Sequence, residues 1–162
     1  MKSLLLRMAG YQVWAMEEIL RRCAPIPDPS YRANLGAYYR SIHGTLNHIL
    51  LTDRIWMGRI TGNLYSFTSL DQEVESDRHA LGAALLAQAA AWKPLLETTP
   101  EEAFAEQFHN RNAFGAAMNV LRGGVHLHVF NHATHHRGQI STMVTHLGFP
   151  VPEMDLPDFL KI

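Results

Sequence analysis

The stretch 124–148 constrains the fold most, because it predicts one long helix with polar side chains on its apolar face. Gly124 and Gly148 bound it and Pro150 follows, as is common where a helix ends. At about 100° per residue, one face of this helix carries Val125, Val129, His132, His136, Ile140, Met143 and Leu147. The opposite arc carries Asn131, Thr134, Arg137, Ser141 and Thr145. His132 and His136 are therefore placed in the middle of the apolar stripe, and must be accommodated in the core.

Three further stretches predict helices at 4–22, at about 41–60 and near 76–96, because apolar residues recur in them at helical spacing. Three prolines, Pro25, Pro27 and Pro29, end the first as a stiff connection, and Gly62 ends the second. Pro94 is expected to kink or end the third. Four long helices with long connections predict an all-α four-helix bundle.

Shorter elements are expected between and after these helices. Residues 99–102 read as a capping box that opens a short helical turn. Asn110, Asn112 and Gly115 indicate a turn between two extended pieces within 104–122, and so a small β-hairpin before the last helix. The tail 149–162 contains three prolines and is expected to lie extended on the surface.

Composition narrows the class of protein. The 162 residues carry a net charge of −1 and are 47% hydrophobic, which suits one domain spanning 1–162. The near-neutral charge argues against a nucleic-acid partner. No stretch approaches the roughly 20 apolar residues of a membrane helix, and the apolar run near the N-terminus is too short for a signal peptide. A soluble cytoplasmic protein is therefore expected.

The chain has ten histidines but one cysteine, Cys23, which excludes an intramolecular disulfide framework and any CxxC motif. His132 and His136 are four residues apart, so on a helix both imidazoles can reach one metal ion. Two ligands are too few, and His48 on the helix at 41–60 is the best candidate for a third, because bundle helices pack about 8–10 Å apart. The alternative is that these are hydrogen-bonded core histidines, which would each need a buried partner.

Other catalytic motifs are missing. Ala133 stands where an HExxH zinc protease has its glutamate. A di-iron bundle needs two Glu-x-x-His pairs, and only 106–109 matches, outside the predicted long helices. The chain has no GxSxG, P-loop or Rossmann glycine pattern.

Two motifs resemble those of a known family. Residues 41–48 followed by 53–56 resemble the second-helix signature of the DinB family, and 131–140 resembles its last-helix signature. Tyr11 and Trp14 are similar to its first-helix pattern. The resemblance implies a bundle of DinB/YfiT type, a homodimer, and a divalent ion held by the residues at the ligand positions of the motifs, which are His48, His132 and His136. The wider superfamily includes thiol-dependent S-transferases and a mycothiol-dependent isomerase, and some family members are induced by DNA damage.

Three neutral imidazoles leave the charge of the ion uncompensated and at least one coordination position open, as in catalytic sites. Such an ion deprotonates a coordinated thiol, so a thiol substrate needs no strong protein base. The leading hypothesis is a metal-dependent thiol S-transferase of detoxification type, with a small-molecule substrate and a low-molecular-weight thiol as cosubstrate. Zinc or nickel is the expected ion, with iron or another divalent metal as the alternative.

Two other hypotheses stay open. One is metal-assisted hydrolysis of a small ester or amide, which needs a base nearby. The other is a non-enzymatic stress-response bundle in which the metal only holds helices together, which predicts a closed ion with no pocket above it.

Supporting residues are also predicted. His128, His135 and Asp53 are candidates to assist the reaction if the geometry allows, although Asp53 interrupts an apolar stripe and structural pairing with an arginine is the better explanation for it. Tyr11 and Trp14 are candidates to line the pocket.

Two predictions concern the outside of the second helix. His43, Asn47 and Arg54 form a polar arc that is expected to face solvent. The rest of this helix is apolar around more of its circumference than one bundle core requires, which predicts a partner, most simply a second copy in a homodimer.

Overall fold

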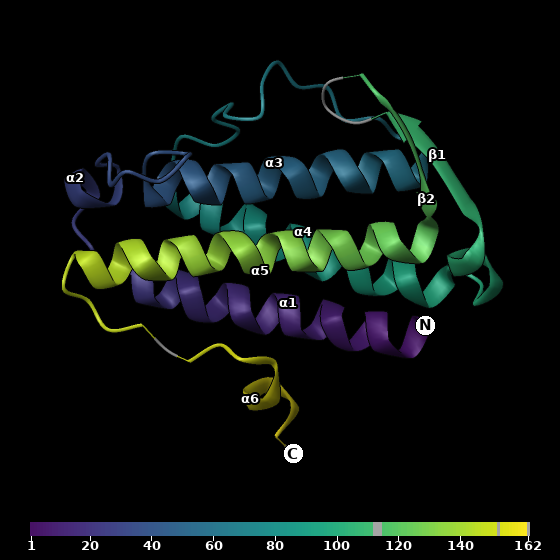
Figure 1. Cartoon of the computed structure of the whole chain (residues 1–162). Helices are drawn as coiled ribbons and strands as arrows, with labels where there is room; N and C mark the ends of the chain where they lie inside the picture. The colour runs from purple at the N-terminus through teal and green to yellow at the C-terminus, as the bar shows by residue number, and fades with distance from the viewer. Residues whose placement is uncertain (112–114, 152, 162) are drawn as a thin grey trace.

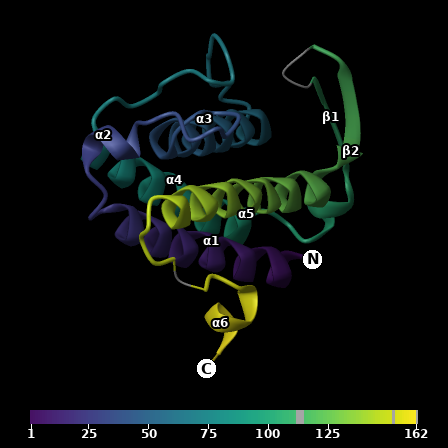
Figure 2. The ribbon, with the colours of Figure 1, turned by 60° about the vertical axis from the view of Figure 1, so that its left-hand side comes forward.

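Four long helices form the body of the protein: α1 (Lys2–Cys23), α3 (Ile42–Thr61), α4 (Arg78–Thr98) and α5 (Arg122–His146). In the computed structural model, which describes residues 1–111, 115–151 and 153–161, α1 and α3 each pack against both α4 and α5 (Figures 1 and 2). The predicted all-α four-helix bundle is confirmed. None of the described helices combines the length and hydropathy needed to cross a bilayer.

Side chains and glycines at the helix ends explain several of the boundaries. The Ser41 hydroxyl caps α3 by accepting the Gly44 N–H at 3.0 Å, and the Asp77 carboxylate caps α4 by accepting two backbone N–H groups. Gly62 ends α3 in the left-handed conformation, at φ 83°. Pro94 lies inside α4, which continues to Thr98, so this proline does not end the helix.

The predicted hairpin is present as strands β1 (Gln107–Arg111) and β2 (Ala117–Leu121), which pair antiparallel. Asn112, one of the residues of the predicted turn, lies outside the described residues. Strand β2 runs directly into α5, so the hairpin stands at the N-terminal end of the helix that carries most of the histidines (Figure 1).

The capping box predicted at 99–102 is wrong. The Thr99 hydroxyl donates to the Leu95 carbonyl at 2.7 Å, which finishes α4 instead of opening the next element. The 3-10 helix η1 (Glu102–Ala105) follows, and no side chain caps its start.

Two short helices lie in the connections. Helix α2 (Asp28–Tyr31) lies within the proline-rich link after α1, and α6 (Leu156–Leu160) lies in the tail. The tail is therefore not simply extended: the Phe159 ring of α6 packs against Tyr11, and the Tyr11 hydroxyl donates to the Met154 carbonyl at 2.5 Å. Pro152 and Ile162 of this tail lie outside the described residues.

A buried polar layer separates two apolar clusters in the core. Along α1, Met16 belongs to one cluster and Ala9 to the other, and Gln12 between them is fully buried. The Gln12 amide oxygen accepts a 2.6 Å hydrogen bond from Arg137, which is only 2% exposed. Arg137 lies on the arc of the last helix opposite the apolar stripe and is nevertheless buried, because α5 packs against both α1 and α3 and buries more than one face.

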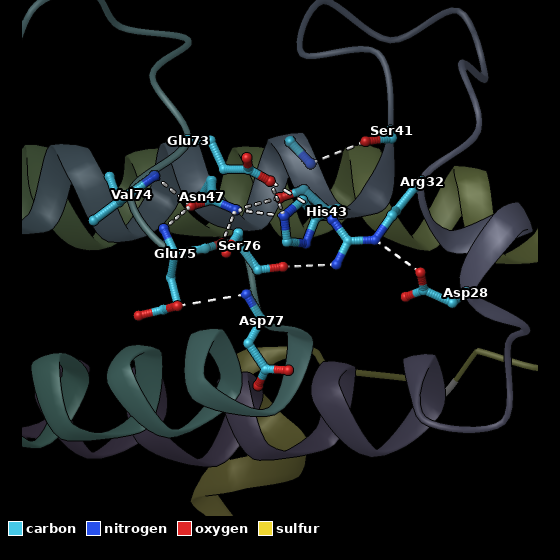
Figure 3. A network of polar contacts seen from close by, with 11 residues as sticks. Asp28, Arg32, Ser41, His43, Asn47, Glu73, Val74, Glu75, Ser76 and Asp77 are labelled. Atoms are coloured by element: carbon cyan, nitrogen blue, oxygen red, sulfur yellow. Dashed lines mark hydrogen bonds and ion pairs between the residues drawn. The ribbon is translucent and has the colours of Figure 1, made fainter.

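The segment between α3 and α4 runs along the outside of α3 (Figure 1). Asn47 holds it there: its amide oxygen accepts the backbone N–H groups of Val74 at 2.8 Å and Glu75 at 2.9 Å (Figure 3). His43 Nε2 lies 2.6 Å from a Glu73 carboxylate oxygen. Both His43 and Asn47 are buried, so the prediction that this arc faces solvent is wrong for them.

This covering segment also changes the argument for a partner. Residues 63–75 of the same chain cover part of the outer side of α3. Some of the apolar surface that suggested a partner is therefore buried within the monomer. The homodimer stays a prediction, and it loses the support of that pattern.

Gly58 tests how closely the covering segment must approach α3. A Cβ at Gly58 would lie 2.5 Å from the Asn63 carbonyl oxygen and 2.9 Å from the Tyr65 nitrogen, both backbone atoms. We expect Gly58→Ala to lower the free energy of unfolding by about 1–3 kcal/mol, because the backbone must move. Gly82→Ala in α4 is the matched control: its Cβ would meet only Leu20 at 3.9 Å, so the helix propensity of alanine should stabilise it by up to about 1 kcal/mol. Equal effects of the two substitutions in chemical denaturation would contradict the close approach.

Candidate metal centre

Three imidazoles from two helices meet at one point in the bundle. His48 Nε2 of α3 lies 3.3 Å from His132 Nε2 of α5, and His136 Nε2 lies 3.1 Å from the same atom. All three ligand atoms lie within 4.8 Å of one another. The structure thus brings together the three residues selected from helical spacing and from the motif positions.

The helices determine this convergence. His132 and His136 are one turn apart on α5, so their rings lie on the same face, with centroids 4.4 Å apart. Helix α3 packs against this face and presents His48, which is 3% exposed. A three-histidine cluster with this spacing is compatible with metal binding.

Hydrogen bonds on the far side of two rings orient them. His48 Nδ1 lies 2.8 Å from the Leu70 carbonyl oxygen, and His136 Nδ1 lies 2.7 Å from the Gln139 side-chain oxygen. Each contact requires the ring to donate its Nδ1–H, which leaves Nε2 as a lone pair. Metal-ligating histidines are commonly held in the same way by an oxygen acceptor.

The tautomers that follow cannot satisfy the cluster without a cation. With lone pairs at the Nε2 atoms of His48 and His136, His132 has at most one Nε2 proton to offer between two contacts. At least one close contact then sets lone pair against lone pair. Burial lowers the pKa of His48 to about 4 and also lowers the pKa of His136, so a second proton on either of these rings does not relieve it. The donor set fits a bound metal ion better than a network of core hydrogen bonds.

The surroundings keep the cluster neutral and rigid. Burial lowers the pKa of His48 to about 4, and it also lowers the pKa of His136. The Tyr39 ring stacks on His48 with centroids 3.8 Å apart and meets His136 edge-on. Burial raises the pKa of Tyr39 to about 12, so its hydroxyl stays protonated near neutral pH. Ligands must be deprotonated to bind a metal, and this environment supplies them in that form.

A cavity of about 610 Å³ opens directly onto the three imidazoles. Its walls come from α3, α5, the covering segment and strand β2, and are mostly apolar: Thr52, Ile55, Trp56, Phe67, Leu70, Met118, Val120 and Val125 are among them. None of the described residues that line it is Asp or Glu. A ligand in this cavity would therefore meet the cluster beside mostly apolar walls, with no Asp or Glu among the described lining residues.

Of the supporting histidines, His128 alone lines the cavity. Its ring centroid lies 5.6 Å from that of His132 and 5.2 Å from that of Trp56. Although His128 is exposed, partial burial of its ring lowers its pKa below the ordinary value. His135 is exposed and does not line the cavity, but its Nε2 lies 3.2 Å from the Gln139 nitrogen, so Gln139 links it to His136.

The other predicted candidates lie elsewhere. Asp53 is buried in the polar layer, where it accepts a 3.4 Å hydrogen bond from the Trp92 indole, and it does not line the cavity. Tyr11 and Trp14 pack against Phe159 of α6, so the structure does not place them in the pocket. Three further histidines, His79, His109 and His146, lie exposed on the surface.

Sequence reasoning missed Tyr39, Leu70 and Gln139. Tyr39 and Leu70 come from connections, where no helical periodicity marks an inward side chain. Gln139 carried a detectable signal, because it follows His136 by three residues on a predicted helix and so lies on the same side.

Comparisons with known proteins indicate one family for this chain. A family model described as the DinB family matches residues 1–162. The Bacillus subtilis (strain 168) protein named Protein DinB is 23% identical over 154 residues, which cover 92% of this chain and 89% of that protein. No solved structure matches significantly.

Substitution of Gln139 tests whether the hydrogen bond that orients the His136 ring supports metal binding. We expect Gln139→Leu to weaken metal affinity by about tenfold or more, because His136 loses the oxygen that accepts its Nδ1–H. Gln139→Glu keeps an acceptor and should retain the affinity. Competition with a chromophoric chelator measures both, and Thr142→Ala, an exposed position one turn further along α5, is the control. Unchanged affinity in Gln139→Leu would show that this hydrogen bond does not support the site.

The pH dependence of stability tests whether burial raises the pKa of Asp53 in the polar layer. Burial raises its pKa from 3.8 to about 7, so the folded protein keeps a proton that the unfolded chain releases near pH 4. The contribution of Asp53 to stability is therefore greatest below the unfolded pKa and declines as the pH rises towards 7. The unfolding free energy of the natural protein minus that of Asp53→Asn should fall between about pH 4 and pH 7 and then level off. A difference that does not change with pH would contradict the raised pKa.

Proposed function

The chain belongs to the DinB family, and we propose that it holds a divalent metal ion through His48, His132 and His136 and acts as a thiol S-transferase. The observation that carries the proposal is the convergence of three Nε2 atoms on the wall of an apolar cavity whose described lining residues include no Asp or Glu. Zinc or nickel suits a set of three imidazoles, and iron is the alternative.

The donor set favours a catalytic role for the ion. When bound, the ion would supply Lewis acidity that lowers the pKa of a coordinated thiol, so the thiol would react as thiolate. Three neutral ligands leave its positive charge undiminished, and the cavity gives a substrate access to the same point. A metal that only holds helices together predicts a closed site, and the cavity counts against that hypothesis.

The cavity walls and the residues around the three histidines would support the reaction of the thiol. The apolar walls exclude water, which otherwise competes with the thiol for the electrophile. Leu70 and Gln139 hold the rings of His48 and His136 in place. His128 lines the cavity with a neutral imidazole and is placed to accept the proton that the thiol releases.

The reaction proposed is a substitution or a ring opening. The thiolate sulfur forms a bond to an electrophilic carbon, and chloride leaves with the electrons of the broken C–Cl bond. For an epoxide, a C–O bond breaks and the oxygen takes up the proton that came from the thiol. No oxidant or reductant is needed. A thiol brought in from solution fits the chain, because burial raises the pKa of its single cysteine, Cys23, to about 12 and leaves it inert.

The hydrolysis of a small ester or amide is the second candidate function. His128 favours it, because a neutral imidazole in the cavity is also a base for water. The other two bases considered for this reaction, Asp53 and His135, do not line the cavity.

An activity screen separates these proposals. Metal-loaded protein is incubated with glutathione, bacillithiol or mycothiol and with chlorinated or epoxide electrophiles, and conjugates are measured by mass spectrometry. We expect conjugation with at least one thiol, and its loss after chelation and in His136→Ala, with His146→Ala as the active control. The S-transferase proposal fails if no thiol gives metal-dependent conjugation. Metal-dependent cleavage of esters or amides without thiol would favour hydrolysis instead.

A further inference from the structure

The cavity contains one full positive charge that has no anionic partner. Arg59 of α3 lines it, and its guanidinium lies over the Trp56 ring at 4.7 Å from the centroid. Among the described residues, no carboxylate lies within ion-pair distance of Arg59 and no hydrogen-bond partner contacts its guanidinium. Burial lowers its pKa, yet an arginine stays protonated near neutral pH.

Two other arginines, one of them fully buried, are held by hydrogen bonds instead. Arg137 donates to the Gln12 and Thr134 side chains, and Arg78 donates to the Ile26 carbonyl at 2.7 Å. Arg59 has only the face of an indole ring. Partial removal from water without an anion is costly for a guanidinium, and a ligand that brings an anion would offset that cost.

Helix geometry places this charge at a defined distance from the three histidines. Arg59 follows His48 by eleven residues, which at about 100° per residue is close to three full turns. Both side chains therefore lie on the same side of α3, about 16 Å apart along its axis at their Cα atoms. Thr52, Ile55 and Trp56 line the cavity between them.

The lining also indicates which anion fits. Arg59 is the only Lys or Arg among the described residues of the cavity wall. One planar guanidinium pairs with one carboxylate through two parallel hydrogen bonds. The more highly charged phosphate would find no second Lys or Arg among the described residues that line this cavity.

We propose that Arg59 is the anion-binding residue of this cavity, and that its ligand is an elongated thiol with an apolar middle and a carboxylate at the end away from the sulfur. The claim that the ligand is a thiol rests on the proposed function. The claim that it ends in a carboxylate rests on Arg59 alone.

Two matched thiols test the inference. Mercaptooctanoate and mercaptooctanol have the same chain and differ in the terminal group. Each is titrated into Co²⁺-loaded protein while the visible absorption of the cobalt is followed. We expect the natural protein to bind mercaptooctanoate about tenfold more tightly than mercaptooctanol. Arg59→Gln should lose this preference while keeping its affinity for mercaptooctanol.

A second titration separates the carboxylate end from the metal. Octanoate and octanol, which have no thiol, are titrated calorimetrically into metal-free protein. We expect octanoate to bind more tightly than octanol, and Arg59→Gln to abolish the difference. Arg54→Gln is the matched control, because Arg54 lies on the same helix, with its guanidinium 5.7 Å from the Tyr65 ring centroid, and does not line the cavity. It should behave like the natural protein.

The outcomes distinguish the two proposals. Equal affinity for the carboxylate and the alcohol in both titrations, or a preference that survives in Arg59→Gln, overturns the role of Arg59 and leaves the metal site standing. If neither thiol changes the cobalt absorption but the affinity for octanoate still depends on Arg59, the proposed thiol chemistry fails. The role of Arg59 as the anion-binding residue is then supported.

Discussion

The contact of three neutral imidazoles inside the bundle is the constraint on which the rest of the site depends. Their Nε2 atoms meet at 3.1 Å and 3.3 Å, and hydrogen bonds behind two of the rings direct lone pairs at the same point. Such an arrangement is unfavourable by itself and favourable around a cation. The fold can maintain it because α3 and α5 are packed helices whose positions are set over their whole length by apolar cores on both sides of the buried polar layer.

The covering segment between α3 and α4 joins the fold to the site. Hydrogen bonds to Asn47 hold this segment against α3, and the missing side chain of Gly58 allows its backbone to approach closely. The Leu70 carbonyl of the segment accepts the hydrogen bond from His48. The same segment supplies Phe67 and Leu70 to the cavity wall. Packing on the outside of α3 therefore orients a ligand of the proposed metal and encloses the space in which a substrate would bind.

Periodicity was sufficient to predict the four helices and the facing trio His48, His132 and His136, because each long helix has an apolar stripe and an HxxxH pair must share one face. It failed where tertiary contacts decide the outcome. Arg137 lies opposite the apolar stripe on the helical wheel but is buried, because α5 packs against both α1 and α3. Tyr39 and Leu70 belong to connections, and Tyr11 and Trp14 contact a tail helix that no pattern indicated. Local sequence carries little information about such long-range contacts.

The central claim is that these three histidines hold one metal ion, and the most direct measurement is metal binding by purified protein beside its single variants. Metal content and affinity are determined for the natural protein, His48→Ala and His136→Ala, with the exposed His109→Ala as the control. The account predicts one divalent ion per chain in the natural protein and the control, and loss of the ion or a large fall in affinity in the other two. Unchanged metal content in both His48→Ala and His136→Ala would contradict it.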